Sequence, residues 1–128
     1  MIDRPRYYRL RPDHSAEPVD VGGRFDEAAL LAWADEVWGD GNGRRVAFTV
    51  VAPGVEVSTV FLGIDHNHSG KGPPILFETM TFDDYGGGDQ WRYSTWKEAV
   101  AGHNAAVAIL RAKVVKGMAV DILGKPKP

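Results

Sequence analysis

The chain has 128 residues, of which 44% are hydrophobic, and this size and composition predict a single domain with a real core over residues 1–128. Charged residues make up 25% and the formal net charge is -2, which excludes a strongly basic nucleic-acid binder and an acidic DNA mimic as descriptions of the whole chain. Cysteine is absent, which excludes disulfides, thiolate zinc sites and cysteine nucleophiles.

Two further features concern membranes and export. Residues 1–6 lack the apolar segment of a secretory signal. The longest uninterrupted apolar run, residues 105–110, is far shorter than the roughly 20 residues that a helix needs to cross a bilayer. We therefore expect a soluble intracellular protein with no membrane partner.

The first predicted element is a strand over residues 6–10. It carries Arg6, Tyr7, Tyr8 and Arg9, residue types that bind phosphate and stack on bases, so these four are the candidate nucleic-acid contacts. The same charges suit an edge strand that is kept soluble by its charge, which is the interpretation we favour. Residues 13–23 contain Pro and Gly at positions that break any period, and they predict an irregular segment.

A first helix is predicted over residues 25–38. Asp26 is a good N-cap, and Phe25 before it can pack on Leu30 one turn later. The apolar side chains that share one helical face are Leu30, Trp33, Ala34 and Val37. The glycine-rich segment 39–43 then ends the helix. It does not match a phosphate-binding loop, because such a loop is followed by a Lys-Ser/Thr pair and this segment is not.

Four strands are predicted next. Residues 45–51 and 55–64 form a hairpin around a turn that contains Pro53 and Gly54. A strand over residues 75–82 and a short strand over residues 91–93 follow, separated by an acidic, glycine-rich segment that we expect to be mobile.

The second helix opens with a capping box, Thr95 at the N-cap and Glu98 three residues later. The pattern predicts that it runs to about Lys116 and ends at Gly117. Residues 118–123 would then add a short strand or strap, and residues 124–128 form a flexible, solvated tail.

These elements predict an α+β domain in the order β-α-β-β-β-β-α. Its antiparallel sheet has about five strands, and both helices pack on one face of that sheet. Trp33 and Trp96 would then lie between the helices and the sheet.

Polar residues gather around the two central strands. The loop that joins them, residues 66–74, begins just after Asp65 and holds His66 and His68. Glu78 lies in mid-strand on the same pleat face as Leu76, Met80 and Phe82, where a carboxylate is costly without a partner.

His103 lies at the middle of the apolar face of the second helix. It is either a core histidine bonded to a carbonyl or carboxylate, which is the interpretation we favour, or half of a charge-assisted pair with Glu78 or Asp65. The candidate catalytic set for acid/base chemistry is therefore Asp65, His66, Glu78 and His103.

A metal site would use Asp65, His66 and His68, with Glu78 or His103 added from across the fold. Imidazole and carboxylate ligands suit zinc, manganese or iron. His66 and His68 lie on a glycine-flanked loop, and no HExxH motif or Gly-x-Ser-x-Gly elbow is present. We therefore expect metal to be absent or loosely bound, and we expect no cofactor.

Three segments carry a resemblance to a known family: STVFLGIDH at residues 58–66, PPILFETM at 73–80 and RYSTWKEAVAGH at 92–103. Together they resemble a family of small proteins encoded in bacterial phages and prophages that has no assigned activity. The resemblance covers residues 46–103 and implies a genomic setting, but it implies no catalytic residue and no ligand. It favours an accessory protein in the cytoplasm of the bacterial host.

The leading hypothesis is thus a small phage- or prophage-encoded binding protein that modulates a host component by protein–protein interaction, with a homodimer as an open alternative. The second hypothesis is a metal-dependent or acid/base enzyme centred on Asp65, His66, Glu78 and His103. The third is a weak nucleic-acid-binding module. An enzyme predicts a pocket in which those four residues converge, whereas a binding protein predicts an exposed apolar patch without that convergence.

Overall fold

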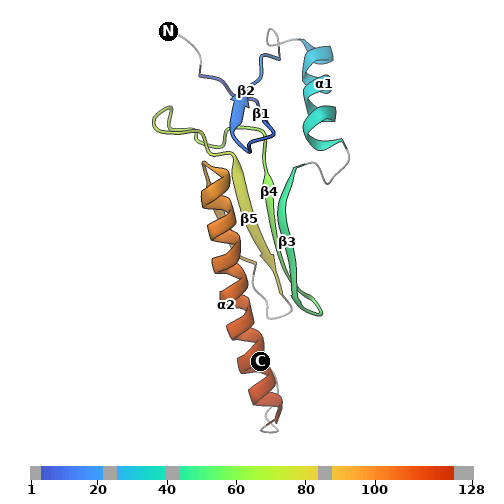
Figure 1. The fold of residues 1–128 in the computed structure, drawn as a ribbon, viewed down its shortest axis with the longest axis vertical. Helices are drawn as coiled ribbons and strands as arrows, with labels where there is room; N and C mark the ends of the chain where they lie inside the picture. Colours follow the sequence, from blue (N-terminus) through green and yellow to red (C-terminus); the bar gives the residue numbers. More distant parts are fainter. Residues whose placement is uncertain (1–3, 22–25, 40–43, 84–87, 123–128) are drawn as a thin grey trace.

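The computed structural model describes residues 4–21, 26–39, 44–83 and 88–122. Within these residues the fold is α+β, as predicted, but it contains two antiparallel sheets instead of one sheet of five strands. The elements are β1 (Tyr8–Leu10), β2 (Ala16–Pro18), α1 (Glu27–Trp38), β3 (Arg45–Ala52), β4 (Val55–Phe61), β5 (Phe77–Phe82), β6 (Gln90–Tyr93) and α2 (Trp96–Ile122) (Figure 1).

The small sheet corrects the expectation that residues 13–23 are irregular. Ala16–Pro18 form β2 and pair with β1, so that Leu10 lies opposite Ala16. The turn between the strands is closed by the N–H of Arg11, which donates to the carbonyl of Ser15 over 2.8 Å. A strand of three residues, the last of them Pro18, is too short for alternation to reveal it.

The large sheet is a simple meander in the order β3-β4-β5-β6. The predicted hairpin turn at Pro53 and Gly54 is confirmed, and Gly54 takes the positive φ of 77° that the turn needs. Helix α2 covers one face of this sheet (Figure 1). That face buries Val57, Thr59 and Phe61 of β4 almost completely.

Helix α1 does not share that face, so the prediction of two helices on one side is wrong. It lies at the end of the sheet, beside β1 and the residues that follow β4 (Figure 1). The indole Nε1 of Trp33 donates to the carbonyl of Tyr8 over 2.9 Å, and that of Trp38 to the carbonyl of Leu62 over 3.2 Å. Because α1 packs on β1 and on the residues after β4 and not on the face of a sheet, only a narrow stripe of this helix is buried.

The predicted face of α1 is accordingly only half right. Trp33 and Val37 are buried, whereas Leu30 is 37% exposed. The predicted N-cap is confirmed, because Asp26 Oδ1 accepts the N–H of Ala29 over 3.0 Å. Phe25, the predicted partner of Leu30, lies outside the described residues, as do residues 40–43 of the expected glycine-rich terminator.

The capping box at the start of α2 is confirmed by reciprocal hydrogen bonds of 3.1 Å between Thr95 and Glu98. The predicted end is wrong, because the helix continues through Gly117 to Ile122, so residues 118–122 are helical and not a strand; residue 123 lies outside the described residues. A glycine inside a helix costs only about 1 kcal/mol relative to alanine, which is too little to end a helix by itself. The expected tail, residues 124–128, and most of the expected mobile segment, residues 84–87, lie outside the described residues.

No helix in the described part of the chain combines the length and the apolar content that crossing a membrane requires.

The buried apolar side chains of the described residues form two clusters. The first joins β1, α1, the end of β4 and the first turn of α2, through Tyr8, Trp33, Val37, Phe61, Leu76, Phe77 and Ala99. The second lies under the middle of α2 and contains Val55, Val57, Ala106, Val107 and Leu110.

Candidate functional site

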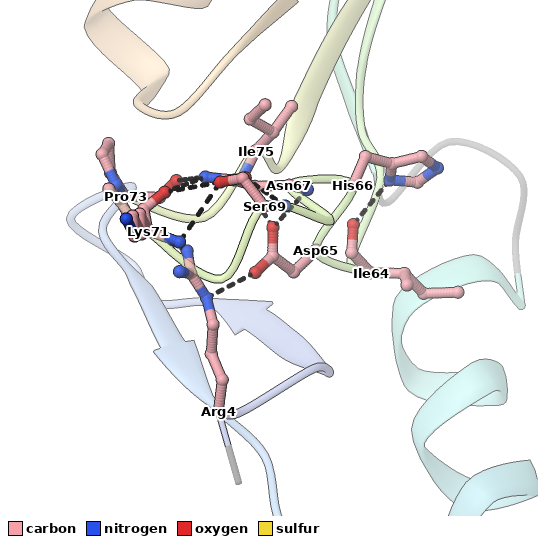
Figure 2. A network of polar contacts seen from close by, with 10 residues as sticks. Arg4, Ile64, Asp65, His66, Asn67, Ser69, Lys71, Pro73 and Ile75 are labelled. Carbon is pink, nitrogen blue, oxygen red and sulfur yellow. Dashed lines mark hydrogen bonds and ion pairs between the residues drawn. The ribbon is translucent and has the colours of Figure 1, made fainter.

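Asp65 is the centre of a hydrogen-bond network that orders the loop between β4 and β5 (Figure 2). Its Oδ2 accepts from Arg4 Nε over 3.0 Å, and its Oδ1 accepts the backbone N–H groups of Asn67 and Ile75 over 2.7 and 2.9 Å. Burial alone would raise the pKa of Asp65, but the two backbone bonds and the Arg4 guanidinium outweigh it and hold the pKa below its ordinary value. The carboxylate is therefore anionic and committed to the loop.

The rest of the loop is ordered by Asn67 (Figure 2). Its Nδ2 donates to the carbonyls of Lys71 and Pro73 over 2.8 and 2.9 Å, and its Oδ1 accepts from the Ser69 hydroxyl over 2.6 Å. Arg4 Nη2 adds a bond of 2.7 Å to the carbonyl of Gly72. These polar side chains thus stabilise the loop itself, a role that Asx-type turns explain.

The two loop histidines do not form a metal site with Asp65. His66 Nδ1 lies 2.8 Å from the carbonyl of Ile64, so this nitrogen carries the proton and donates it. The rings of His66 and His68 lie 6.4 Å apart between centroids. Asp65 turns to Arg4 instead, and among the described residues no three His, Asp or Glu side chains gather as metal ligands.

Glu78 pairs with β6 and not with His103, which corrects the predicted pair. Its Oε2 accepts from Arg92 Nε over 3.0 Å and from Gln90 Nε2 over 2.6 Å. The cause is register, because Glu78 lies directly opposite Arg92 on the neighbouring strand. Glu78 shares a pleat face with Met80, as predicted, but this is the face that α2 does not cover.

His103 lies on the other side of the sheet, beneath α2, and is 3% exposed. Its Nδ1 is 2.8 Å from the hydroxyl of Thr59, and its Nε2 is 2.8 Å from that of Thr49. Thr59 in turn bonds to the hydroxyl of Thr79 over 2.7 Å. Burial lowers the pKa of His103, so the imidazole is held neutral.

The interpretation of His103 as a core histidine is therefore right, but its partners are hydroxyls and not a carbonyl or carboxylate. The sequence signal that could have identified them is a series of threonines at alternating strand positions that face the helix. Threonine is common in strands because of its β-propensity alone, so these threonines did not indicate hydrogen-bond partners for a histidine.

The candidate nucleic-acid contacts are largely occupied within the protein. Tyr8 is buried, and the ring of Tyr7 meets Trp33 edge-on at 4.8 Å between centroids. Arg9 forms ion pairs with Glu17 and Glu36 at 3.0 and 3.2 Å. Tyr8 is thus unavailable for base stacking and Tyr7 is half-buried, whereas Arg6 is exposed.

A cleft of about 530 Å³ lies where three segments meet: the turn between β1 and β2, residues 73–74 and the first turn of α2. His14 from the turn stacks on the indole of Trp96, with 3.8 Å between ring centroids and 9° between planes. Apolar walls come from Pro74, Leu76 and Phe77, and Lys97 adds a cation at the surface.

The conformation of His14 is unusual for a residue with a side chain, since its φ is 71°. The turn enforces it: the His14 N–H donates to the carbonyl of Arg11 over 2.9 Å, and Asp13 Oδ1 accepts the N–H of Ser15 over 2.9 Å. The turn thereby holds an imidazole ring against Trp96. Nothing in the sequence of residues 13–23 indicated this.

The face of the large sheet opposite α2, here called the open face, is the second exposed feature. Four large apolar side chains on it are between 38% and 57% exposed, namely Phe48, Val50, Met80 and Phe82. Exposed apolar side chains that lie next to one another mark interaction surfaces more often than isolated ones do.

Asp65 and His66 lie in the loop, Glu78 on the open face and His103 beneath α2, so the four acid/base candidates occupy three separate places. None of them lines the cleft beside His14. The chain matches no family model, and no curated protein or solved structure is detectably similar to it.

Proposed function

We propose that this chain is a binding protein that acts by protein–protein contact, and that the cleft beside His14 and Trp96 receives a short segment of its partner. The observation that carries the proposal is the cleft itself. Segments far apart in the sequence meet to build a cavity of about 530 Å³, a volume within the range of ordinary ligand sites.

The lining suggests the chemistry of the bound segment. Aromatic rings and prolines contribute six of the thirteen lining residues, and grooves that contain such side chains accept extended apolar or proline-containing peptides. The carboxylate of Asp13 is bonded to Ser15, whereas the ammonium of Lys97 is exposed and, among the described residues, makes no ion pair. An extended apolar segment that carries an acidic residue or a carboxylate fits these walls best.

The resemblance to small phage and prophage proteins bears on the identity of the partner. A phage- or prophage-encoded accessory protein in the cytoplasm of a bacterium would act on a host component. We therefore propose a host protein as the source of the bound segment.

The acid/base hypothesis has less geometric support than the binding hypothesis. General acid/base chemistry needs groups within reach of one substrate. Glu78 and His103 lie on opposite faces of the sheet, and the charge of Asp65 is committed to Arg4. The nucleic-acid hypothesis also has less support, because Tyr8 is buried and Tyr7 is half-buried against Trp33.

The test is capture of host proteins by tagged variants, followed by titration of the purified candidate. The cleft variant combines His14→Gly, which suits the positive φ, with Lys97→Glu. Its matched control combines His68→Gly with Lys113→Glu, which make the same chemical changes at exposed positions outside the cleft.

We expect one host protein to be bound directly by wild type and by the control, and the cleft variant to weaken its Kd at least about tenfold, which equals about 1.4 kcal/mol. Equal binding by both variants would move the recognition site elsewhere. Failure of every captured protein to bind directly in titration would contradict the proposal.

A further inference from the structure

The cleft beside His14 is lined by side chains that donate hydrogen bonds. Tyr8 contributes a phenol hydroxyl, Trp96 an indole N–H and Lys97 an ammonium group. The indole and the ammonium can only donate, and a phenol donates one hydrogen bond. The chemistry of the bound segment therefore depends on whether these donors already have acceptors inside the protein.

The hydroxyl of Tyr8 has no such acceptor. Tyr8 is only 7% exposed, and its backbone N–H and carbonyl are bonded to Gly63 and Trp33, but its hydroxyl forms no hydrogen bond with any described residue. Buried tyrosines usually bond through this group. Burial and the nearby Asp65 carboxylate raise the pKa of the hydroxyl, so it keeps its proton. The oxygen is not fully enclosed, so a molecule in the cleft can reach it.

Trp96 differs in the same way from the two tryptophans of α1. Trp33 and Trp38 each donate their indole N–H to a backbone carbonyl. Trp96 is half-buried beneath the ring of His14, and nothing in the described part of the chain accepts from its Nε1. Together with the exposed ammonium of Lys97, the cleft presents three donors that lack acceptors.

The acceptors around the cleft are already engaged. The Asp13 carboxylate accepts from the N–H and the hydroxyl of Ser15 over 2.9 and 2.5 Å. The Thr95 hydroxyl accepts the N–H of Glu98 and donates to its carboxylate, both over 3.1 Å. A segment rich in N–H groups would therefore find few partners here, whereas a segment that brings carbonyl oxygens would find three donors.

We propose that the segment bound in the cleft is a proline-rich stretch in the polyproline II conformation, flanked by an acidic residue. This inference rests on the proposed function and names the chemistry of the bound segment. A polyproline II helix has no internal hydrogen bonds, so its carbonyls are free to accept, and its prolines carry no N–H. Tyr8 and Trp96 donate to carbonyls of the segment, and Lys97 pairs with the acidic residue.

The walls of the cleft suit this ligand as well. Pro74, Leu76 and Phe77 offer apolar surface on which proline rings pack, and aromatic-lined grooves are the usual receptors of polyproline II segments. Because proline fixes φ, such a segment loses little conformational freedom when it binds.

Two other common forms of a bound segment fit less well. An α-helix bonds its carbonyls internally except in its last turn, so it would leave the donors of Tyr8 and Trp96 without acceptors. An added β-strand binds through backbone groups at a sheet edge, whereas the donors of this cleft are side chains.

The test is selection of peptides from a random display library on the immobilised wild-type protein, followed by titration of the selected peptides. Tyr8→Phe removes the hydroxyl and keeps the ring. Since this hydroxyl has no partner in the free protein, the change should not lower stability in urea unfolding. Tyr7→Phe makes the same change at the neighbouring position, which does not line the cleft, and is the control.

We expect the selected peptides to repeat proline with the period of about three residues of this helix and to carry an acidic residue. Tyr8→Phe should weaken their Kd about three- to tenfold, and Tyr7→Phe should leave it unchanged. Replacing the prolines of a peptide by alanine should weaken binding at least about tenfold. Lys97→Glu should prefer the same peptide with its acidic residue replaced by lysine.

Selection of no peptide, selection of peptides without proline, or equal affinity of wild type and Tyr8→Phe would overturn the inference. Proline-free peptides whose binding is lost in the cleft variant, His14→Gly with Lys97→Glu, would overturn it while leaving the cleft as the binding site. A host protein that this variant binds as tightly as wild type would instead contradict the proposed function.

A second measurement reports on Trp96 directly. In a nuclear magnetic resonance titration, a selected peptide should shift the indole N–H signal of Trp96, identified by its loss in Trp96→Phe. The indole signals of Trp33 and Trp38 should move little, because both groups are bonded to carbonyls of the protein. An unshifted Trp96 signal would overturn its assignment as a donor to the ligand.

Discussion

A hydrogen bond of 2.8 Å joins the imidazole of His103 to the hydroxyl of Thr59 and links helix α2 to strand β4 inside the core. Because Thr59 continues to Thr79 and His103 continues to Thr49, one polar chain crosses strands β3, β4 and β5 under the helix. When every buried polar group in such a network has a hydrogen-bond partner, the network favours a single packing arrangement of the surrounding core. Removing one member leaves the others without partners.

The first prediction concerns this chain of bonds. Thr59→Val keeps the shape of the side chain but leaves His103 and Thr79 short of a partner, so it should lower the free energy of unfolding by about 1–3 kcal/mol. Adding His103→Gln should cost less than the sum of the two single changes, because the groups are coupled. Urea titrations of the four proteins give both values. Glu78→Gln, on the opposite face, is the control and should add to His103→Gln within about 0.5 kcal/mol.

The second prediction is a pH dependence of stability. Burial lowers the pKa of His103 from its ordinary 6.5, so below that pH the unfolded chain binds a proton more readily than the folded protein does. The contribution of His103 to stability is therefore complete above the ordinary pKa and falls as the pH drops through it. Urea unfolding of wild type and of His103→Gln across this range should give a smaller decrease for the variant. Parallel curves would mean that the imidazole is not held neutral.

The third prediction separates the two helices. Leu110 is 1% exposed in the core beneath α2, so Leu110→Ala should cost about 2–5 kcal/mol through loss of buried volume. Leu30 is 37% exposed on α1, and Leu30→Ala should cost less than about 1 kcal/mol. Midpoints of chemical unfolding measure both effects. A large loss at Leu30 would show that α1 buries a wider face than the one that contains Trp33 and Val37.

The fourth prediction uses two glycines that share a backbone conformation. Gly63 and Gly70 have φ values of 77° and 75°, but a Cβ on Gly63 would lie 3.0 Å from both Trp33 and Val37, whereas one on Gly70 would meet nothing within 4 Å. Gly70→Ala should therefore cost only the backbone strain, about 1–2 kcal/mol.

Gly63→Ala adds overpacking between α1 and the sheet and should cost about 1–3 kcal/mol more than Gly70→Ala. Thermal or urea unfolding of the two variants, measured side by side, isolates the steric part. Equal losses would indicate that α1 moves aside without cost.

The features that sequence predicted well are those whose partners are close along the chain. Thr95 and Glu98 form their capping box across three residues, and Pro53 with Gly54 sets a turn by its own dihedral preferences. The alternation in β5 likewise placed Glu78 on the correct pleat face. In each case the physical cause acts within one or two turns of chain.

The features that sequence did not predict depend on which strand or segment arrives as a neighbour. The pairing of Glu78 with Arg92 depends on the register between β5 and β6, and the short sequence of β6 does not show which of its residues lies opposite Glu78. The cleft needs three segments to meet, and His14 belongs to a stretch without any period. The extension of α2 past Gly117 follows from a helix long enough to absorb one glycine.

The bonds of Arg4 carry a consequence for how the molecule forms during synthesis. Arg4 reaches Asp65 across 61 positions of sequence and the carbonyl of Gly72 across 68. When only the first half of the chain has emerged from the ribosome, Arg4 is present but its partners at Asp65 and Gly72 are not. Contacts this distant pay a loop-closure cost before they form, and the cleft beside His14 also needs Pro74 and Trp96, so this cleft is completed only in the second half of translation.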